Sequence, residues 1–176
     1  MRANQPVVLD TSLLLTLSAV GALERLLAMS RYEWHVTPMI RTEVTRRTTR
    51  AVIDRAIAGG QVRLTAVDIA DQSEMNAWAE WEQLVDVGQA EAIALVLARR
   101  WVIGLDDRYA QRLLDHRIGS GCWLDATSVL LTAVADGAMS FDESMMQSCR
   151  PHPITRGLHA HNLFAPPRPV PCSSDR

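Results

Sequence analysis

The chain contains no lysine, because all 18 of its basic residues are arginines. A phosphate-binding GxxxxGK[ST] loop requires a lysine that reaches the nucleotide phosphates, so this class of nucleotide-binding protein is excluded. The net charge of −2 over 176 residues gives no global attraction to nucleic acid. The 48% hydrophobic content is that of an ordinary globular protein. This length favours one domain.

Cysteine is also scarce, and the three residues Cys122, Cys149 and Cys172 are scattered along the chain. An odd, scattered set argues against a disulfide framework and favours a reducing compartment. No apolar run reaches the 18 residues of a membrane span. The segment from Arg2 to Ala22 has some features of a signal peptide, but Asp10 interrupts it and its removal would delete a core strand. We therefore expect a cytoplasmic protein with no membrane partner.

Short apolar runs alternate with stretches of helical periodicity. The pattern predicts strands at 7–10, 34–36, 62–65 and 101–105, with a further short strand after 121. It predicts helices at 13–27 (capped by Ser12), 38–58, 71–85, 88–100 and 125–136. This alternation indicates an α/β fold with a mainly parallel sheet and helices on both faces. We assign residues 1–145 to this domain and the proline-rich residues 146–176 to an extended tail.

Four acidic residues are predicted to meet at the carboxyl edge of the sheet. Asp10 and Asp106 each follow a buried strand, whereas Glu43 and Glu91 lie in early turns of helices that begin at the same edge. Carboxylates that lie close together raise each other's pKa values unless cations neutralise them. Mg²⁺ or Mn²⁺ suits an all-oxygen site, and the usual chemistry of such a site is phosphoester hydrolysis.

Each acid also has a purely structural interpretation. Glu43 can pair with Arg47 one helical turn later, and Glu91 can complement the positive end of its helix. Asp10 can cap the helix that follows it, and either Asp106 or Asp107 can do the same. Asp125, where the last strand meets the last helix, is expected to be an N-cap, with a fifth metal ligand as the alternative.

The order LDTSLLL, TEV, GQAEAIALVLA and GLDDRYAQRL resembles the PIN-domain nucleases, in the branch with GE-x-EAI and DD-R segments. The resemblance covers about residues 6–138 and includes IGSGCWLDATSVLLTAVADG. Lone-domain members of this branch are similar to the toxins of VapBC-type toxin–antitoxin pairs. The resemblance implies a three-layer PIN-like fold, Mg²⁺- or Mn²⁺-dependent ribonuclease activity, and frequent homodimers. By position, it implies that the catalytic and metal-binding acids are Asp10, Glu43, Glu91 and Asp106.

The chain departs from this pattern at Gln89, where the branch often has a glutamate. This departure leaves open a catalytically weak or inactive PIN-like module that binds RNA or a protein. Between Asp106 and Asp107, we choose Asp106 as the ligand because it is the first residue after the strand. The long tail has no counterpart in the family pattern.

Other protein classes fit less well. Haloacid-dehalogenase phosphatases need a second aspartate where this chain has Ser12, and response-regulator receivers need a lysine. Cys149, His152, His159 and His161 suggest zinc, but their spacing fits no common site.

The expected partners are RNA, a cognate antitoxin and a second copy of the chain. Two groups of arginines flank the acids and are candidates to contact phosphate, although a solvated helix face is equally compatible with them. They are Arg41, Arg46, Arg47, Arg50 and Arg55 near Glu43, and Arg108 and Arg112 near Asp106. Trp78 and Trp81, one helical turn apart, suggest a surface for dimerisation or for an antitoxin, although tryptophans more often fill cores or a dimer interface.

Overall fold

A computed structural model describes residues 4–119, 121–140 and 142. Five parallel strands form one sheet in the order β3-β2-β1-β4-β5. The central strand pairs on both sides, with Val7 opposite Trp34 on one neighbour and Val102 on the other. The strands are β1 (Gln5–Leu9), β2 (Tyr32–Val36), β3 (Val62–Leu64), β4 (Val102–Gly104) and β5 (Trp123–Leu124).

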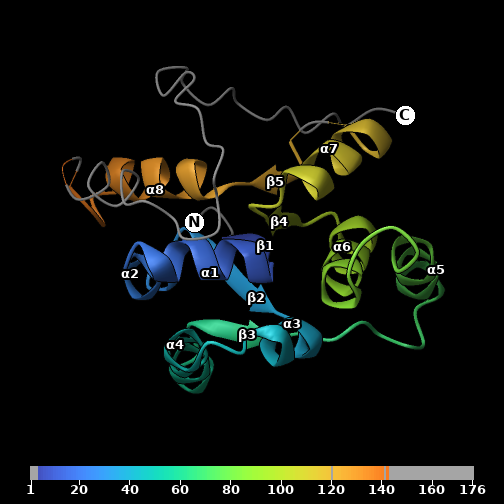
Figure 1. The fold of residues 1–176 in the computed structure, drawn as a ribbon, viewed down its shortest axis with the longest axis horizontal. Helices are drawn as coiled ribbons and strands as arrows, with labels where there is room; N and C mark the ends of the chain where they lie inside the picture. The colour runs from blue at the N-terminus through green and yellow to red at the C-terminus, as the bar shows by residue number, and fades with distance from the viewer. Residues whose placement is uncertain (1–3, 120, 141, 143–176) are drawn as a thin grey trace.

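Helices cover both faces of the sheet, so the predicted three-layer α/β architecture is confirmed (Figure 1). Helix α1 contacts α2, α4 and α8, and α2 also contacts α4 and α8, whereas α5 packs against α6, which contacts β1 and β4. Helix α3 contacts both α1 and α6. The helices are α1 (Thr11–Ala19), α2 (Leu23–Leu27), α3 (Pro38–Glu43), α4 (Arg47–Ala58), α5 (Gln72–Trp81), α6 (Val87–Arg99), α7 (Arg108–Arg117) and α8 (Ala126–Ala135).

The central strand of the sheet is buried on both of its faces. Val7, Val8 and Leu9 are fully enclosed, as expected for a strand of a parallel sheet that is covered on both faces. Helix α6 is buried along most of its length, from Gly88 to Val96. The carboxyl end of β1 and the amino end of α6 therefore belong to two of the most buried elements of the described chain.

Two long helices predicted from periodicity are broken in the structure. The 13–27 helix is divided into α1 and α2 at Gly21, whose φ of 78° is not helical. The 38–58 helix is divided into α3 and α4 after Glu43, where Val44 has a ψ of 87°. The predicted Ser12 cap is also wrong, because Asp10 is the N-cap of α1.

The tryptophan pair on α5 does not form the predicted docking surface. Trp81 is 2% exposed and packs inside the monomer core, and Trp78 is partly buried against that core. The predicted tail at 146–176, with Cys149, His152, His159 and His161, lies outside the described residues.

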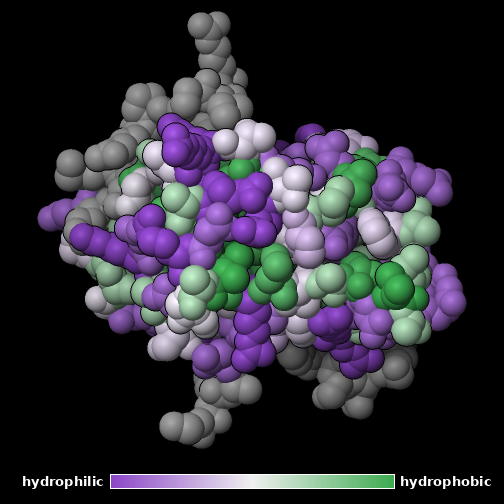
Figure 2. Space-filling model, turned by 90° about the horizontal axis from the view of Figure 1, so that it is seen from below, coloured by the Kyte–Doolittle hydropathy of each residue, from purple (hydrophilic) through white to green (hydrophobic). Residues whose placement is uncertain are grey.

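The molecular surface mixes polar and apolar groups. Seen from the side of α3, α4 and β3, apolar patches are small and are interrupted by hydrophilic side chains (Figure 2). The large apolar side chains that are most exposed include Leu64 on β3 and Ile69 shortly after it. Within the described part of the chain, no helix is long and apolar enough to cross a membrane.

Candidate active site

Asp10 occupies the turn between β1 and α1 and is 3% exposed. Its backbone amide donates to the carbonyl of Gly104 on β4 (2.8 Å), which joins the ends of the two central strands. Its Oδ2 accepts hydrogen bonds from the amide (2.9 Å) and the hydroxyl (2.5 Å) of Ser12. The capping role considered for Asp10 is therefore present in the structure.

The pKa of Asp10 is raised above its ordinary value of 3.8. Burial is the largest cause, because desolvation penalises the charged carboxylate. The hydrogen bonds from Ser12 and the Thr11 amide lower the pKa, and the negative charge of Glu43 raises it again. Two of the predicted site acids are thus electrostatically coupled across 33 positions of sequence.

Ser12 connects Asp10 to Asp106. Its hydroxyl donates to Asp10 and accepts from the backbone amide of Asp106 at 3.0 Å. The Asp106 carboxylate accepts from the Thr16 hydroxyl (2.7 Å), and its other oxygen lies 3.5 Å from the Ala126 amide. Asp106 is thereby directed toward α1 and the start of α8.

Asp107 has a different position. Its Oδ1 accepts from the amides of Tyr109 and Ala110, so it is the N-cap of α7. Asp125 similarly caps α8 through the Ser128 amide, as its structural interpretation expected. The side chains of these two aspartates are thus engaged at helix starts.

Glu43 joins the turn after β1 to the start of α6. Its carboxylate accepts from the Thr11 hydroxyl (2.9 Å) and from the Gly88 amide (3.0 Å), in place of the considered Arg47 pair. The fit at Gly88 is close, because a Cβ built there would lie 2.7 Å from Cδ and Oε2 of Glu43. The glycine is needed here because of this close approach.

Glu91 is 5% exposed in α6, and its Oε2 accepts from the Met39 amide in the first turn of α3 (3.3 Å). A carboxylate at a helix N-terminus is stabilised by the helix dipole. Glu91 thus complements the start of α3, not that of its own helix. Glu43 is the last residue of α3, whereas Glu91 contacts its first turn. The two glutamates therefore lie at opposite ends of this short helix.

The structure brings all four predicted acids to the carboxyl edge of the sheet, where the hydroxyls of Thr11 and Ser12 hold three of them. It does not bring them into one cluster. Among residues 4–119, 121–140 and 142, no group of three or more His, Cys, Asp and Glu side chains is placed to hold a metal ion. The donors fit a hard divalent cation in type, since they are carboxylate and hydroxyl oxygens.

The supporting hydroxyls were missed by the sequence interpretation. Thr11 and Ser12 directly follow Asp10, and Thr16 lies one turn further along α1, so their closeness in sequence was an available signal. The contact of Gly88 with Glu43 had no such signal, because it depends on how α3 packs against α6.

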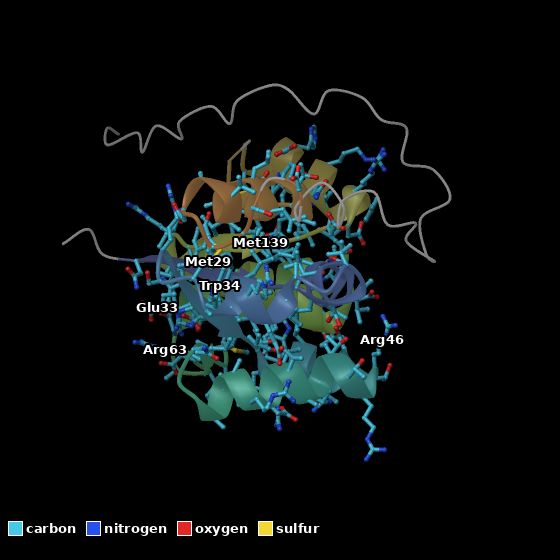
Figure 3. The ribbon with its side chains drawn as sticks, turned by 90° about the vertical axis from the view of Figure 1, so that its left-hand side faces the viewer. Met29, Glu33, Trp34, Arg46, Arg63 and Met139 are labelled. Atoms are coloured by element: carbon cyan, nitrogen blue, oxygen red, sulfur yellow. The ribbon has the colours of Figure 1, made fainter. Side chains whose placement is uncertain are left out.

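The arginines predicted to flank the acids differ in their pairing, because Arg41 is paired with Asp54 whereas others have no carboxylate partner among the residues that the structure describes. Several arginines form ion pairs, including Arg55 with Glu24, Arg63 with Glu33 and Arg99 with Glu74. Within the described chain, Arg46, Arg47, Arg108 and Arg112 have no ion-pair partner. Arg46 lies on the opposite side of the molecule from Glu33 and Arg63 (Figure 3).

Comparison with known proteins gives no assignment: no protein-family model matches the chain, and no curated protein sequence matches it significantly.

Proposed function

We propose that this chain is a Mg²⁺- or Mn²⁺-dependent endoribonuclease of PIN-like architecture. The observation that carries the proposal is the linked set of acids around Asp10. A buried carboxylate with a raised pKa lies beside a second acid at the carboxyl ends of parallel strands, where α/β proteins bind their ligands. Asp10, Glu43, Glu91 and Asp106 are the residues that would hold the cation.

The bound cation would supply activation of a water molecule and stabilisation of the leaving oxygen. The residues of the chain itself do the positioning. Ser12 orients Asp10 and the Asp106 backbone, while Thr11 and the Gly88 amide orient Glu43. The unpaired arginines on α4 and α7, with Arg46 just before α4, are the proposed contacts for RNA phosphates.

By the resemblance to VapC-like toxins, we further propose that RNA is the substrate and that a cognate antitoxin binds the protein. The homodimer stays a prediction from that resemblance alone, because the buried Trp81 no longer supports it.

A non-cutting RNA-binding or protein-interaction module is the second candidate. It is favoured by one observation: each of the four carboxylates already accepts a hydrogen bond from the protein. On this alternative, the acids stabilise the turns and helix starts at the sheet edge and no cation is required.

Calorimetric titration with Mn²⁺, together with an RNA cleavage assay, separates the two candidates. Asp10→Asn keeps a good N-cap for α1, so the variant should fold. We expect it to lose both Mn²⁺ binding and cleavage. Asp125→Asn is the matched control, since Asp125 caps α8 and should leave both activities unchanged.

Wild-type-like Mn²⁺ binding by Asp10→Asn would contradict the proposed site. RNA binding by a wild-type protein that neither binds Mn²⁺ nor cleaves RNA would support the non-cutting module.

A further inference from the structure

A groove of about 370 Å³ lies between the segment that joins α5 to α6 and the start of α7. This volume is within the range of roughly 300–1,000 Å³ found for small-molecule sites. Leu84 and Val85 supply its apolar part. Gln89 and Asp107, which also line it, are two positions before Glu91 and directly after Asp106.

Gln89 is the unusual residue of this groove. Its side chain is on the groove wall although the residue is only 8% exposed. Within the described chain, its amide has no hydrogen-bond partner and is not fully enclosed, so it remains accessible from the groove. An amide that has no protein partner and opens to a groove is available to a ligand that supplies both a donor and an acceptor.

The other polar groups restrict that ligand. Asp86 is exposed and makes no capping bond to α6, and the Oδ2 of Asp107 is not used in capping α7. These carboxylates repel phosphate but accept hydrogen bonds from amino groups. Tyr109, which is 57% exposed, offers a ring on which a planar group can stack.

We propose that this groove binds a nucleobase with an exocyclic amino group, adenine being the best match. A glutamine amide pairs with the N6 amino group and N7 of adenine, and the second amino hydrogen is available to a carboxylate. The inference rests on the proposed ribonuclease function and gives it a base preference. Gln89 is then a specificity residue. The branch that the chain resembles often has a glutamate here, and the amide of Gln89 would allow the base recognition that a carboxylate does not.

An arginine side chain of a partner protein is the competing occupant, because a guanidinium also suits carboxylates and a tyrosine ring. The Gln89 amide favours the base. A guanidinium has donors only, so it would leave the NH₂ group of Gln89 without an acceptor. Adenine donates from its N6 amino group to the amide oxygen and accepts from the amide NH₂ group at N7.

The test measures nucleoside binding in chelator by calorimetry or ligand-observed NMR. Nucleosides have no phosphate, and chelator removes metal, so the result does not depend on cleavage. We expect adenosine to bind about tenfold more tightly than purine riboside, which lacks the amino group, and more tightly than uridine. Gln89→Ala and the near-isosteric Gln89→Glu should each weaken adenosine binding about tenfold, whereas Gln72→Ala, at an exposed glutamine of α5, should not.

Tyr109→Phe should retain binding and Tyr109→Ala should lose it, if the ring is the stacking surface. Equal binding of adenosine and uridine, or unchanged adenosine binding in both Gln89 variants, would overturn the inference. Binding of arginine amide without any nucleoside binding would also overturn it and assign the groove to a protein partner. Adenosine binding in a protein that never binds Mn²⁺ would support the groove while contradicting the nuclease.

Discussion

At the scale of single residues, the site depends on how Asp10 is both capped and buried. Its hydrogen bonds from Ser12 stabilise the charged form, yet burial and Glu43 outweigh them and raise its pKa. Sequence alone indicated a costly carboxylate in an apolar run. The sequence did not indicate whether the pKa of Asp10 is raised by burial or lowered by hydrogen bonds. That balance depends on how deeply the turn is buried and on how closely Glu43 approaches.

The raised pKa of Asp10 predicts a pH dependence of folding without metal. The folded state holds the Asp10 proton more tightly than the unfolded state, where the pKa is near 3.8. Its contribution to stability is therefore present below that value and is lost as pH rises through the folded pKa. The amide that replaces the carboxyl group in Asp10→Asn does not titrate, so in chelator the stability of this variant relative to wild type should increase with pH. Denaturant unfolding at several pH values from about 3.5 to 7 measures this; a difference that is constant with pH would contradict it.

Gly88 gives a second prediction at this scale. Alanine normally favours a helix over glycine, but here its Cβ would displace the Glu43 carboxylate. We expect Gly88→Ala to cost about 1–3 kcal/mol of stability and to weaken Mn²⁺ binding. In a Glu43→Ala background the clash is absent, so the same change should be neutral or stabilising. A double-mutant cycle from denaturant unfolding tests this, and additive effects would refute the contact.

At the scale of elements, the number of strands and their places along the chain were predictable, as were the bounds of α6 and α8, whereas the breaks in two long helices were not. Apolar runs such as Val7–Leu9 are buried on both faces, so composition identifies them. The separation of α3 from α4 occurs within TEVTRR, which has no glycine or proline to mark it. The break follows from packing, because α3 is held between α1 and α6 and Glu43 must reach Gly88.

Helix α5 is attached through two Glu–Arg pairs of different burial. Glu74 is 2% exposed and accepts from Arg99 at 2.5 and 3.1 Å and from the Asp68 amide at 2.7 Å. Glu80 pairs with Arg117 at the surface. Glu74→Ala should cost about 3 kcal/mol, because it leaves the partly buried guanidinium of Arg99 and the Asp68 amide without their carboxylate partner. Glu80→Ala should cost less than about 1 kcal/mol. Thermal and denaturant melts of both variants check the contrast, and equal losses would contradict it.

At the scale of the whole molecule, the net charge is only −2, but paired and unpaired arginines are distributed unevenly over the described residues. Arg46, which has no ion pair within the described residues, is three positions after Glu43, while Arg63 pairs with Glu33 on the opposite side of the molecule from Arg46 (Figure 3). Net charge therefore argued against a global attraction to nucleic acid, but it did not exclude a local one. Sequence placed Arg46 and Arg108 near the acids; only the structure showed that these arginines lack carboxylate partners within the described chain while others are paired.

This distribution predicts a local, salt-dependent interaction with RNA. Each arginine that contacts a phosphate of a single strand contributes roughly 0.7 to the slope of log affinity against log salt. In an Asp10→Asn background, which should prevent cleavage, Arg46→Ala and Arg108→Ala should each lower RNA affinity and reduce that slope. Arg63→Ala is the control, because Arg63 is held by Glu33 at 2.7 Å. Fluorescence anisotropy of a labelled single-stranded RNA across a salt series measures both quantities. An equal loss for Arg46→Ala and Arg63→Ala would show that the attraction is not localised at the acid edge.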